Sequence, residues 1–447
     1  YALKPGQMLT VPLPLTWESK ASAVPEKLGI HVWSTNALFS CAYLSRTPGA
    51  VDGSMIAPTT ALGTDYVVAS SGGRFDVPSV DAPSTFAIVA TADRTLVTIT
   101  PTADIRREVV LHGGPTTIAH AHGVTFTDTL DRGVSIQYKT VQPTACTGFD
   151  LTGTTIHASA PVAVVSGVTL SERVCQAPLY TGHAAEMLAP RNTWGKTYYT
   201  SNELGTDLVM IGTRAGQVVR RYDTTLKLRT LTTLTVPGVA YAVQTVAGSR
   251  IESDTAFLLA CYGTNTGGGV AGPTEMLLPM PIEAYQTQVS FFVDSAVPGG
   301  VSYTNTADLF THQKASYVLL DGKPVATVYR TAIDQKYYLW KVPVRPGWHT
   351  VMSDSALTAQ VGGVQGTETY AWSAGTARHP VGSADVIPPL VTSLDQCFGA
   401  RMLMSDTLPQ DLGLQMLVVD SGFNVTLTPD PNWVEGSRMR SSYYDLH

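Results

Sequence analysis

The chain has few charged residues, and this shortage narrows the kinds of protein it can be. Lys, Arg, Asp and Glu make up 14% of its 447 residues, whereas an average soluble domain has about 25%. Thr, Ser, Gly and Ala take their place. We therefore expect a sheet protein with hydroxyl-rich exposed faces rather than a helical cytosolic enzyme.

Basic clusters and long apolar segments are also lacking. The net charge is −6, and the longest basic clusters are the pairs Arg106-Arg107 and Arg220-Arg221. A nucleic-acid-binding or anionic-membrane-binding surface needs a larger basic patch. No apolar run reaches the roughly 18 residues that a membrane helix requires. The first residues also lack the charged and apolar regions of a signal peptide, so we interpret Tyr1 as the start of a mature or excised chain.

Metal-binding and catalytic motifs are absent from the sequence. The five cysteines include no CxxC pair, and zinc sites commonly use that spacing. No GxSxG, HExxH, P-loop or EF-hand pattern occurs. We therefore expect no enzyme activity, no cofactor and no metal, and we assign no acidic loop residue as a calcium ligand. One N-glycosylation sequon begins at Asn424.

An internal repeat carries most of the information. A branched aliphatic residue, a few polar residues and an alternating apolar stretch recur at residues 32–43, 156–167, 251–262 and 351–362. Alternation on both sides of a short polar stretch is typical of a β-hairpin with one buried face. Four such copies at spacings of about 100 residues predict four related β modules.

A second pattern precedes the first within each module. It occurs at residues 86–101, 208–220 and 317–325, and residues 414–429 match 86–101 without a gap. Residues 1–48 contain the first pattern without the second, while the C-terminal part contains the second alone. The chain therefore consists of half a module, three whole modules and the complementary half, and we expect the two halves to pair because unpaired strand edges invite aggregation.

The predicted fold is all-β, with tandem β-sandwich-like modules of about 100 residues; a β-propeller-like ring is the alternative. The predicted parts are an N-terminal half-module at 1–48, three β modules at 49–180, 181–273 and 274–384, and a C-terminal half-module at 385–447 that pairs with 1–48. Pairing within one chain closes the molecule, whereas pairing between chains builds a filament.

Dispersed residues between about 60 and 375 resemble the IgGFc-binding domain family, which occurs at the N-terminus of a mucus glycoprotein and in microbial and invertebrate surface proteins. Those that carry the resemblance most clearly are Asp150, Gly153, Pro161, Gly167, His183, Glu186, Trp194 and Gly195. The sequence departs from the family at Gly182, where an acidic residue is usual, and it lacks the cysteine-rich modules that often follow. The resemblance implies an extracellular adhesive or matrix role and gives less support to binding of antibody Fc.

The resemblance also implies disulfides. Cys146 and Cys175 stand where the family has a cysteine pair around the Ala-Pro-Val stretch. If the terminal half-modules complete each other, Cys41 and Cys397 form a second bridge and Cys261 stays free.

Two groups of residues suggest chemistry. His120 and His122, with His112 as a third ligand, have the spacing of a metal site on one strand face, although a solvent-facing strand edge explains them better. His183 and Glu186 have the spacing of an acid–base pair on one helical turn, although a structural role in a loop explains them better.

Three functions follow in order of preference. The first is an extracellular or cell-surface structural or adhesive protein, with a filament subunit as one form, that binds other protein chains including copies of itself. The second is a monomeric binding module for glycans or immunoglobulin-like glycoproteins. The third is a carbohydrate-active enzyme, which would need two carboxylates about 5 to 9 Å apart in a cleft.

Overall fold

The computed structural model describes most of the chain. The described residues are 7–35, 39–47, 50–72, 83–108, 117–141, 150–171, 182–201, 207–223, 227–234, 240–244, 249–264, 273–294, 302–365, 368–375, 390–396, 399–405, 427–429 and 441–446. They belong to two compact units, Tyr1–Arg378 and His379–His447.

The first unit is built almost entirely from antiparallel strands, which confirms the predicted all-β fold. The helical elements in the described residues are single 3-10 turns, so none of them is long enough to span a membrane. They are η1 (Leu15–Trp17), η2 (Thr59–Ala61), η3 (Arg191–Thr193), η4 (Ile282–Ala284) and η5 (Thr327–Tyr329).

The first complete module has two layers that share one long strand, β11 (Thr155–Ser171). The first part of β11 pairs with β4 and β6, and β6 continues to β9; the second part pairs with β12 and β5, and β5 continues to β10 and β1. Apolar side chains from both layers form one buried cluster, as expected for a sandwich-like module. The strands are β1 (Val24–Glu26), β4 (Gly63–Val67), β5 (Ser84–Ala90), β6 (Thr95–Thr100), β9 (Phe126–Leu130), β10 (Ser135–Lys139) and β12 (Gly182–Met187). A small strand pair, β7 (Ile105–Arg107) and β8 (Thr117–His120), lies beside β10.

The second module repeats this topology around the long strand β18 (Ser249–Thr264). The first part of β18 pairs with β13 and β15, and its second part pairs with β14 and β19. The strands are β13 (Gly195–Thr200), β14 (Asp207–Gly212), β15 (Gln217–Tyr222), β16 (Leu228–Leu234), β17 (Ala240–Gln244) and β19 (Pro273–Leu277).

The third module repeats the topology around β26 (Gly347–Gln365). Its first part pairs with β20 and β22, and its second part pairs with β21 and β27. The strands are β20 (Gln286–Val293), β21 (Thr304–His312), β22 (Val318–Leu320), β23 (Lys323–Pro324), β24 (Arg330–Ala332), β25 (Tyr337–Pro343) and β27 (Glu368–Ser373).

Two sequence interpretations were wrong in detail. Each copy of the first repeat in the complete modules lies within a single long strand and not in a hairpin, because the polar residues between its apolar parts form a bend that carries the strand from one layer to the other. Residues 317–325 correspond only to the later part of the pattern at 86–101, the part that forms β6, because β21 occupies the position of β5 beside the long strand.

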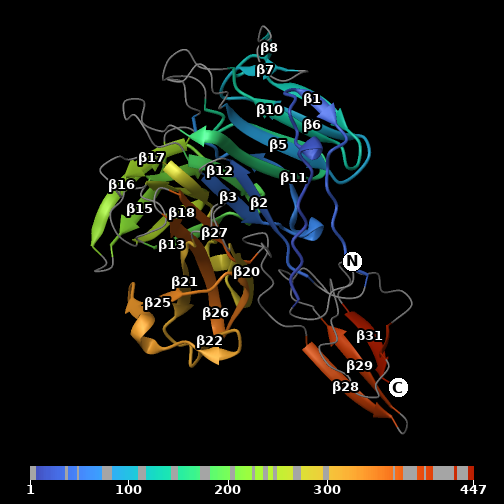
Figure 1. Ribbon diagram of the computed structural model, residues 1–447. Coiled ribbons are helices and arrows are strands. Elements are labelled where there is room, and N and C mark those ends of the chain that lie inside the picture. The colour runs from blue at the N-terminus through green and yellow to red at the C-terminus, as the bar shows by residue number, and fades with distance from the viewer. Residues whose placement is uncertain are drawn as a thin grey trace. The chain divides into compact units, whose positions relative to one another are not determined.

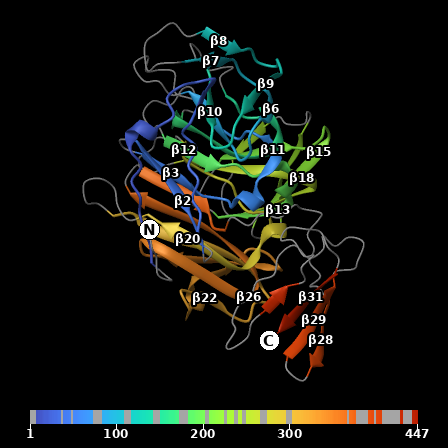
Figure 2. The same ribbon diagram turned by 90° about the vertical axis from the view of Figure 1, so that its right-hand side faces the viewer.

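The remaining strands of the first unit are β2 (Ala42–Thr47) and β3 (Ala50–Met55). They pair only with each other among the described residues, in antiparallel register from Ala42↔Met55 to Thr47↔Ala50. Figures 1 and 2 show β3 beside β12 of the first complete module.

The second unit contains one antiparallel sheet of four strands in the order β28-β29-β31-β30. Its strands are β28 (Leu390–Gln396), β29 (Gly399–Ser405), β30 (Leu427–Pro429) and β31 (Ser441–Leu446). β30 therefore lies at one end of this sheet.

Candidate functional site

Four strands from four different sheets form a closed ring inside the first unit. β3 contacts β12, β12 contacts β19, β19 contacts β27, and β27 contacts β3. In its own sheet each of these four inner strands pairs with one partner only among the described residues, namely β2, β11, β18 and β26. The other edge of each inner strand is buried, and its backbone groups need partners from elsewhere in the ring.

Asp52 on β3 supplies two of those partners. Its Oδ2 accepts the Ala185 N–H of β12 at 3.1 Å and the Met276 N–H of β19 at 3.0 Å. One fully buried carboxyl thus joins three inner strands, and Ser54, two residues further along β3, accepts the Met187 N–H at 3.2 Å.

Two further acidic side chains lie in the ring. Glu186 Oε1 accepts the Leu278 N–H at 3.5 Å, and Glu275 accepts the Thr369 hydroxyl of β27. Glu186 and Glu275 are each 3% exposed. Sequence reasoning missed Asp52 and Glu275 as members of this group, although the tripeptide Glu-Met-Leu shared by residues 186–188 and 275–277 is a signal of repeated inner strands.

The environment of Asp52 favours its neutral form. Burial, followed by the negative charge of Glu186, raises the pKa of Asp52 well above the usual value of 3.8. A cavity of about 30 Å³ adjoins the ring, with Glu186, Ser54 and Leu278 in its lining. This space holds about one or two water molecules, so the ring has the character of a structural core and not of a substrate pocket.

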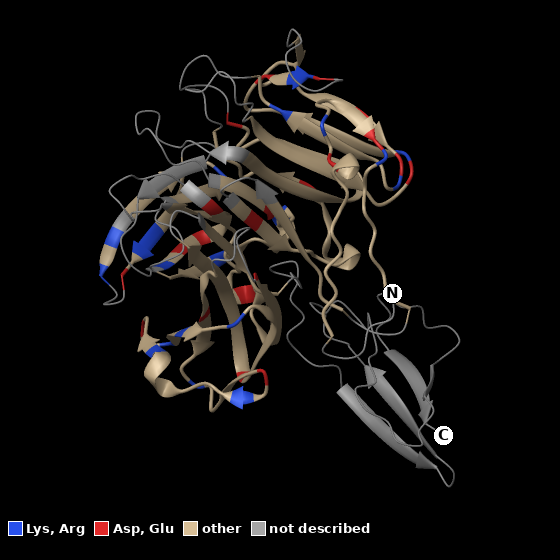
Figure 3. Ribbon diagram, in the orientation of Figure 1, with Lys and Arg blue, Asp and Glu red and all other residues tan. Residues whose placement is uncertain are grey.

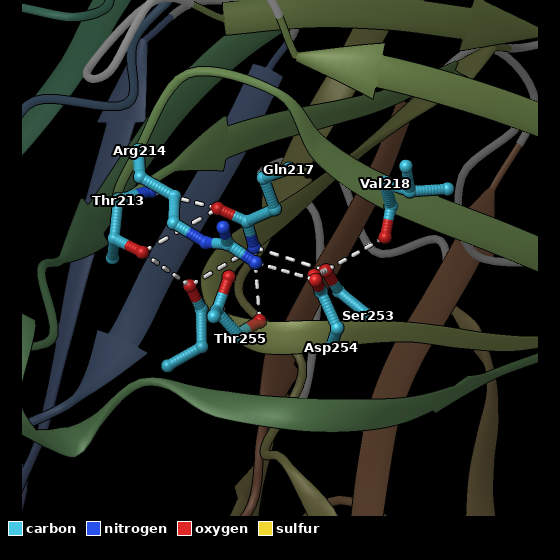
Figure 4. A network of polar contacts seen from close by, with 8 residues as sticks. Thr213, Arg214, Gln217, Val218, Ser253, Asp254 and Thr255 are labelled. Carbon is cyan, nitrogen blue, oxygen red and sulfur yellow. Dashed lines mark hydrogen bonds and ion pairs between the residues drawn. The ribbon is translucent and has the colours of Figure 1, made fainter.

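A second polar network holds the turn between β14 and β15 against the bend of β18 (Figure 4). Gln217 is fully buried; its Oε1 accepts the Thr213 N–H at 2.9 Å, and its Nε2 donates to Ser253 Oγ at 3.1 Å and to Thr255 O at 2.9 Å. Ser253 in turn donates to Val218 O at 2.8 Å. The last module has the same contact, because Ser353 donates to Tyr317 O at 2.8 Å. These contacts stabilise the bend in the long strand.

The first four family residues have structural roles. Asp150 Oδ1 accepts the Thr152 N–H at 2.9 Å and so closes a tight turn, and Gly153 follows with a φ of 92° that suits glycine. Pro161 lies at the irregular point of β11, between the two parts of its pairing with β4. At Gly167 a Cβ would lie 1.8 Å from Ala184 O, so only glycine allows β11 and β12 to approach this closely.

The other four family residues lie at the junctions of the modules. His183 and Glu186 are buried on β12, a strand in which residues three apart point to opposite faces, and so they lie neither on a helical turn nor in a loop. Trp194 is 1% exposed and donates to Ala189 O at 3.2 Å. At Gly195 a Cβ would lie 2.1 Å from Pro281 Cβ, so the glycine allows the second module to pack on the turn that begins the third.

The two described histidines of the metal hypothesis have separate partners. The His120 ring stacks on Phe126 with centroids 3.5 Å apart, and its burial lowers the pKa of His120. His122 Nδ1 lies 2.9 Å from Asp104 Oδ1, and His112 lies outside the described residues. In the described part of the chain no group of three or more His, Cys, Asp or Glu side chains is arranged to hold a metal ion.

The predicted disulfides and glycosylation site stay predictions. Cys146, Cys175, Cys397 and Asn424 lie outside the described residues. Cys41 is half-buried just before β2, and Cys261 is a buried free thiol on β18 whose pKa is raised by burial.

Many of the exposed large apolar side chains lie in the segments before β2. We call β2, β3 and residues 30–41 the open half-module. More than half of the exposed large apolar side chains among the described residues lie within residues 8–43; they are Met8, Leu9, Val11, Leu13, Leu15, Trp17, Ile30, Val32, Trp33, Phe39 and Tyr43. Exposed apolar side chains in such number are candidates for an interaction site.

Charge is also missing from this surface. Residues 7–17 and 30–45 contain no Lys, Arg, Asp or Glu, and Figure 3 shows the extended stretch beside the N label in tan. The opposite face of the open half-module is covered, because Val51 and Met55 of β3 belong to the buried cluster of the last module. We call the exposed apolar side chains of the open half-module its uncovered face.

A comparison with protein families agrees with the sequence resemblance. The model of the family described as IgGFc binding protein matches residues 52–363, which is more than half of the chain. No curated protein and no solved structure gives a significant match. The matched region begins within β3, ends within β26 and includes all eight family residues named above.

Proposed function

The chain belongs to the IgGFc-binding family, and we propose that it is an extracellular structural or adhesive protein that acts by binding other protein chains, including copies of itself. The family is one of binding domains, which supports a binding role. The observation that carries the rest of the proposal is the open half-module, where β2 pairs only with β3 among the described residues and apolar side chains before β2, such as Val32 and Trp33, are exposed.

Completion of this half-module is the proposed means of assembly. β2 has a free edge among the described residues, and an extended segment that adds to such an edge gains main-chain hydrogen bonds and buries its apolar side chains. Addition of a segment from another copy joins chains head to tail, and a head-to-tail contact that does not close into a ring builds a filament. The C-terminal half-module at 385–447 is the proposed donor.

A monomeric binding module is the second candidate. The same open half-module favours it if its partner is the C-terminal half-module of the same chain. In that case the chain closes on itself and does not assemble with other copies. Its function would then be to bind a separate ligand, and we propose a glycan or an immunoglobulin-like glycoprotein.

Sedimentation velocity over a concentration series distinguishes the two candidates. We expect the mean mass to rise with concentration for the native chain and to stay at one chain for Val32→Lys. Val32 is 54% exposed, so a lysine there leaves the folded chain intact but places a charge on the uncovered face. Ile118→Lys is the matched control, because Ile118 is a 56% exposed apolar strand residue outside the open half-module.

The control variant is expected to assemble like the native chain. A compact single chain at every concentration would overturn assembly and leave the monomeric binding module. Assembly that Val32→Lys and Ile118→Lys weaken equally would show that another surface is responsible.

A further inference from the structure

The three complete modules each have an edge strand at the same place in their topology. Among the described residues, β9 pairs with β6 alone in the first module, β16 with β15 alone in the second, and β23 with β22 alone in the third. An unpaired strand edge can add a strand of another chain, and most proteins prevent this with short strands, proline or charged side chains. The three strands can therefore be compared as sites of strand addition.

Two of these edge strands have such protective features. β23 consists of two exposed residues, Lys323 and Pro324, and the proline has no main-chain N–H for an added strand. β9 carries the carboxyl group of Asp128, which accepts the Tyr138 hydroxyl at 2.6 Å. None of the exposed large apolar side chains in the described part of the chain belongs to either strand. Neither strand is therefore suited to bind another chain.

β16 lacks these features. It has seven residues, Leu228–Leu234, and lies at the end of its sheet (Figure 1). It contains no proline and no acidic residue. Its one charged residue, Arg229, forms an ion pair in which Nε lies 2.5 Å from Asp223 Oδ2. Leu228 and Leu231 are 47% and 57% exposed. A long edge strand with exposed apolar side chains is the kind that pairs with another chain.

The order of residues in β16 suits pairing with a second copy of the same strand. An antiparallel pair centred on Leu231 places Leu231 opposite the partner's Leu231, and Thr230 opposite the partner's Thr232. Arg229 then lies opposite the partner's Thr233, so no like charges face each other and destabilise the pair. β16 pairs with β15 in unbroken register on both sides of Leu231, so the centre of the pairing lies in a regular part of the strand.

We propose that β16 joins two copies of this chain by antiparallel pairing about Leu231, so that the sheets of their second modules become continuous. This contact goes beyond the proposed function, since it does not use the open half-module. It has two-fold symmetry, because each chain contributes the same strand, and it leaves no β16 edge for a third chain.

The β16 contact is expected to be weak between two single chains. A specific, stable interface buries about 1,200 to 2,000 Å², which one pair of strands does not supply. A chain that carries Val32→Lys therefore stays single in sedimentation, as expected above. When several chains are already joined, several β16 contacts act together and the joint binding is much stronger.

A single cysteine tests the two-fold pairing, because only a residue at its centre lies opposite its own copy. Leu231→Cys is combined in the full chain with Val32→Lys, which removes the proposed contact of the open half-module, and copper phenanthroline serves as the oxidant. Thr233→Cys in the same background is the matched control, since Thr233 is also exposed on β16. In the proposed register its own copy is four residues away along the strands, which is about 13 Å and too far for a disulfide.

We expect mass spectrometry to find roughly ten times more of the peptide pair bonded at position 231 than of the pair bonded at position 233, because only the first meets the geometry of a disulfide. Equal yields would show that the bonds come from chance collisions. Equal yields, or no bond at position 231, would overturn the inference.

The result is independent of the test of the proposed function, which uses sedimentation of the native chain. A bond at position 231 supports the β16 contact whether or not the native chain assembles through its open half-module. Assembly of the native chain without that bond supports the proposed function and overturns the inference.

Discussion

The main-chain N–H of Met276 donates a hydrogen bond to Asp52 Oδ2 at a distance of 3.0 Å, although the two residues are 224 positions apart in the sequence. The same oxygen accepts the Ala185 N–H. Asp52 therefore links β3 to two other strands of the ring, because it accepts one main-chain N–H from β12 and one from β19. Its raised pKa gives this contact a pH dependence.

Asp52→Asn should remove part of the pH dependence of stability. Because the folded-state pKa of Asp52 is raised above the usual 3.8, its contribution to the free energy of unfolding is fully present below about pH 3.8 and is lost as the pH rises through the raised value. Asn keeps an oxygen that accepts the Ala185 and Met276 N–H groups and does not ionise. Urea unfolding between pH 4 and 8 should show that the native chain loses stability relative to the variant as the pH rises. Parallel curves would mean that Asp52 is not held in its neutral form.

Gln217→Leu should lower the free energy of unfolding by about 3 kcal/mol, because it leaves buried backbone and hydroxyl groups of the bend without partners. Arg214→Ala is the matched control in the same network (Figure 4). The side chains of Arg214 and Asp254 are 53% and 47% exposed, and an exposed ion pair contributes only about 0 to 1 kcal/mol. Chemical denaturation of both variants gives the comparison, and equal losses would contradict the structural role of Gln217.

Gly167→Ala should lower the free energy of unfolding by several kcal/mol, because its Cβ would lie 1.8 Å from Ala184 O and would force β11 away from β12. Val165→Ala, on the same strand and half-buried, should cost about 1 kcal/mol. Thermal unfolding measures both. A Gly167→Ala variant as stable as Val165→Ala would show that the two strands do not approach as closely as described.

The sequence predicted the class of fold because alternation of apolar residues is a local signal. The repeat that contains Ile156, Ile251 and Val351 correctly marked one equivalent strand in each complete module. The same local signal does not separate a hairpin from a bent strand, since both place polar residues between two apolar stretches. In the second and third modules the bend is held by the contacts of Ser253 with Val218 O and of Ser353 with Tyr317 O, and these contacts join residues more than 30 positions apart.

The inner ring could not be predicted in the same way. Asp52 and Glu186 come from strands of different modules, and their contacts with Met276 and Leu278 depend on how the modules pack. The exposure of Val32 could not be predicted from the apolar pattern either, because the sequence around Val32 is typical of a buried strand. Only its comparison with the three buried counterparts identified the open half-module.

Hydrogen–deuterium exchange of the amides of residues 32–44 tests the completion of the open half-module most directly. We predict that, at concentrations where the chain assembles, these amides are protected as strongly as those of residues 351–362 on β26, and that Val32→Lys removes the protection while Ile118→Lys does not. Fast exchange of residues 32–44 at every concentration, beside slow exchange of β26, would show that no strand completes the half-module and would contradict the proposed assembly.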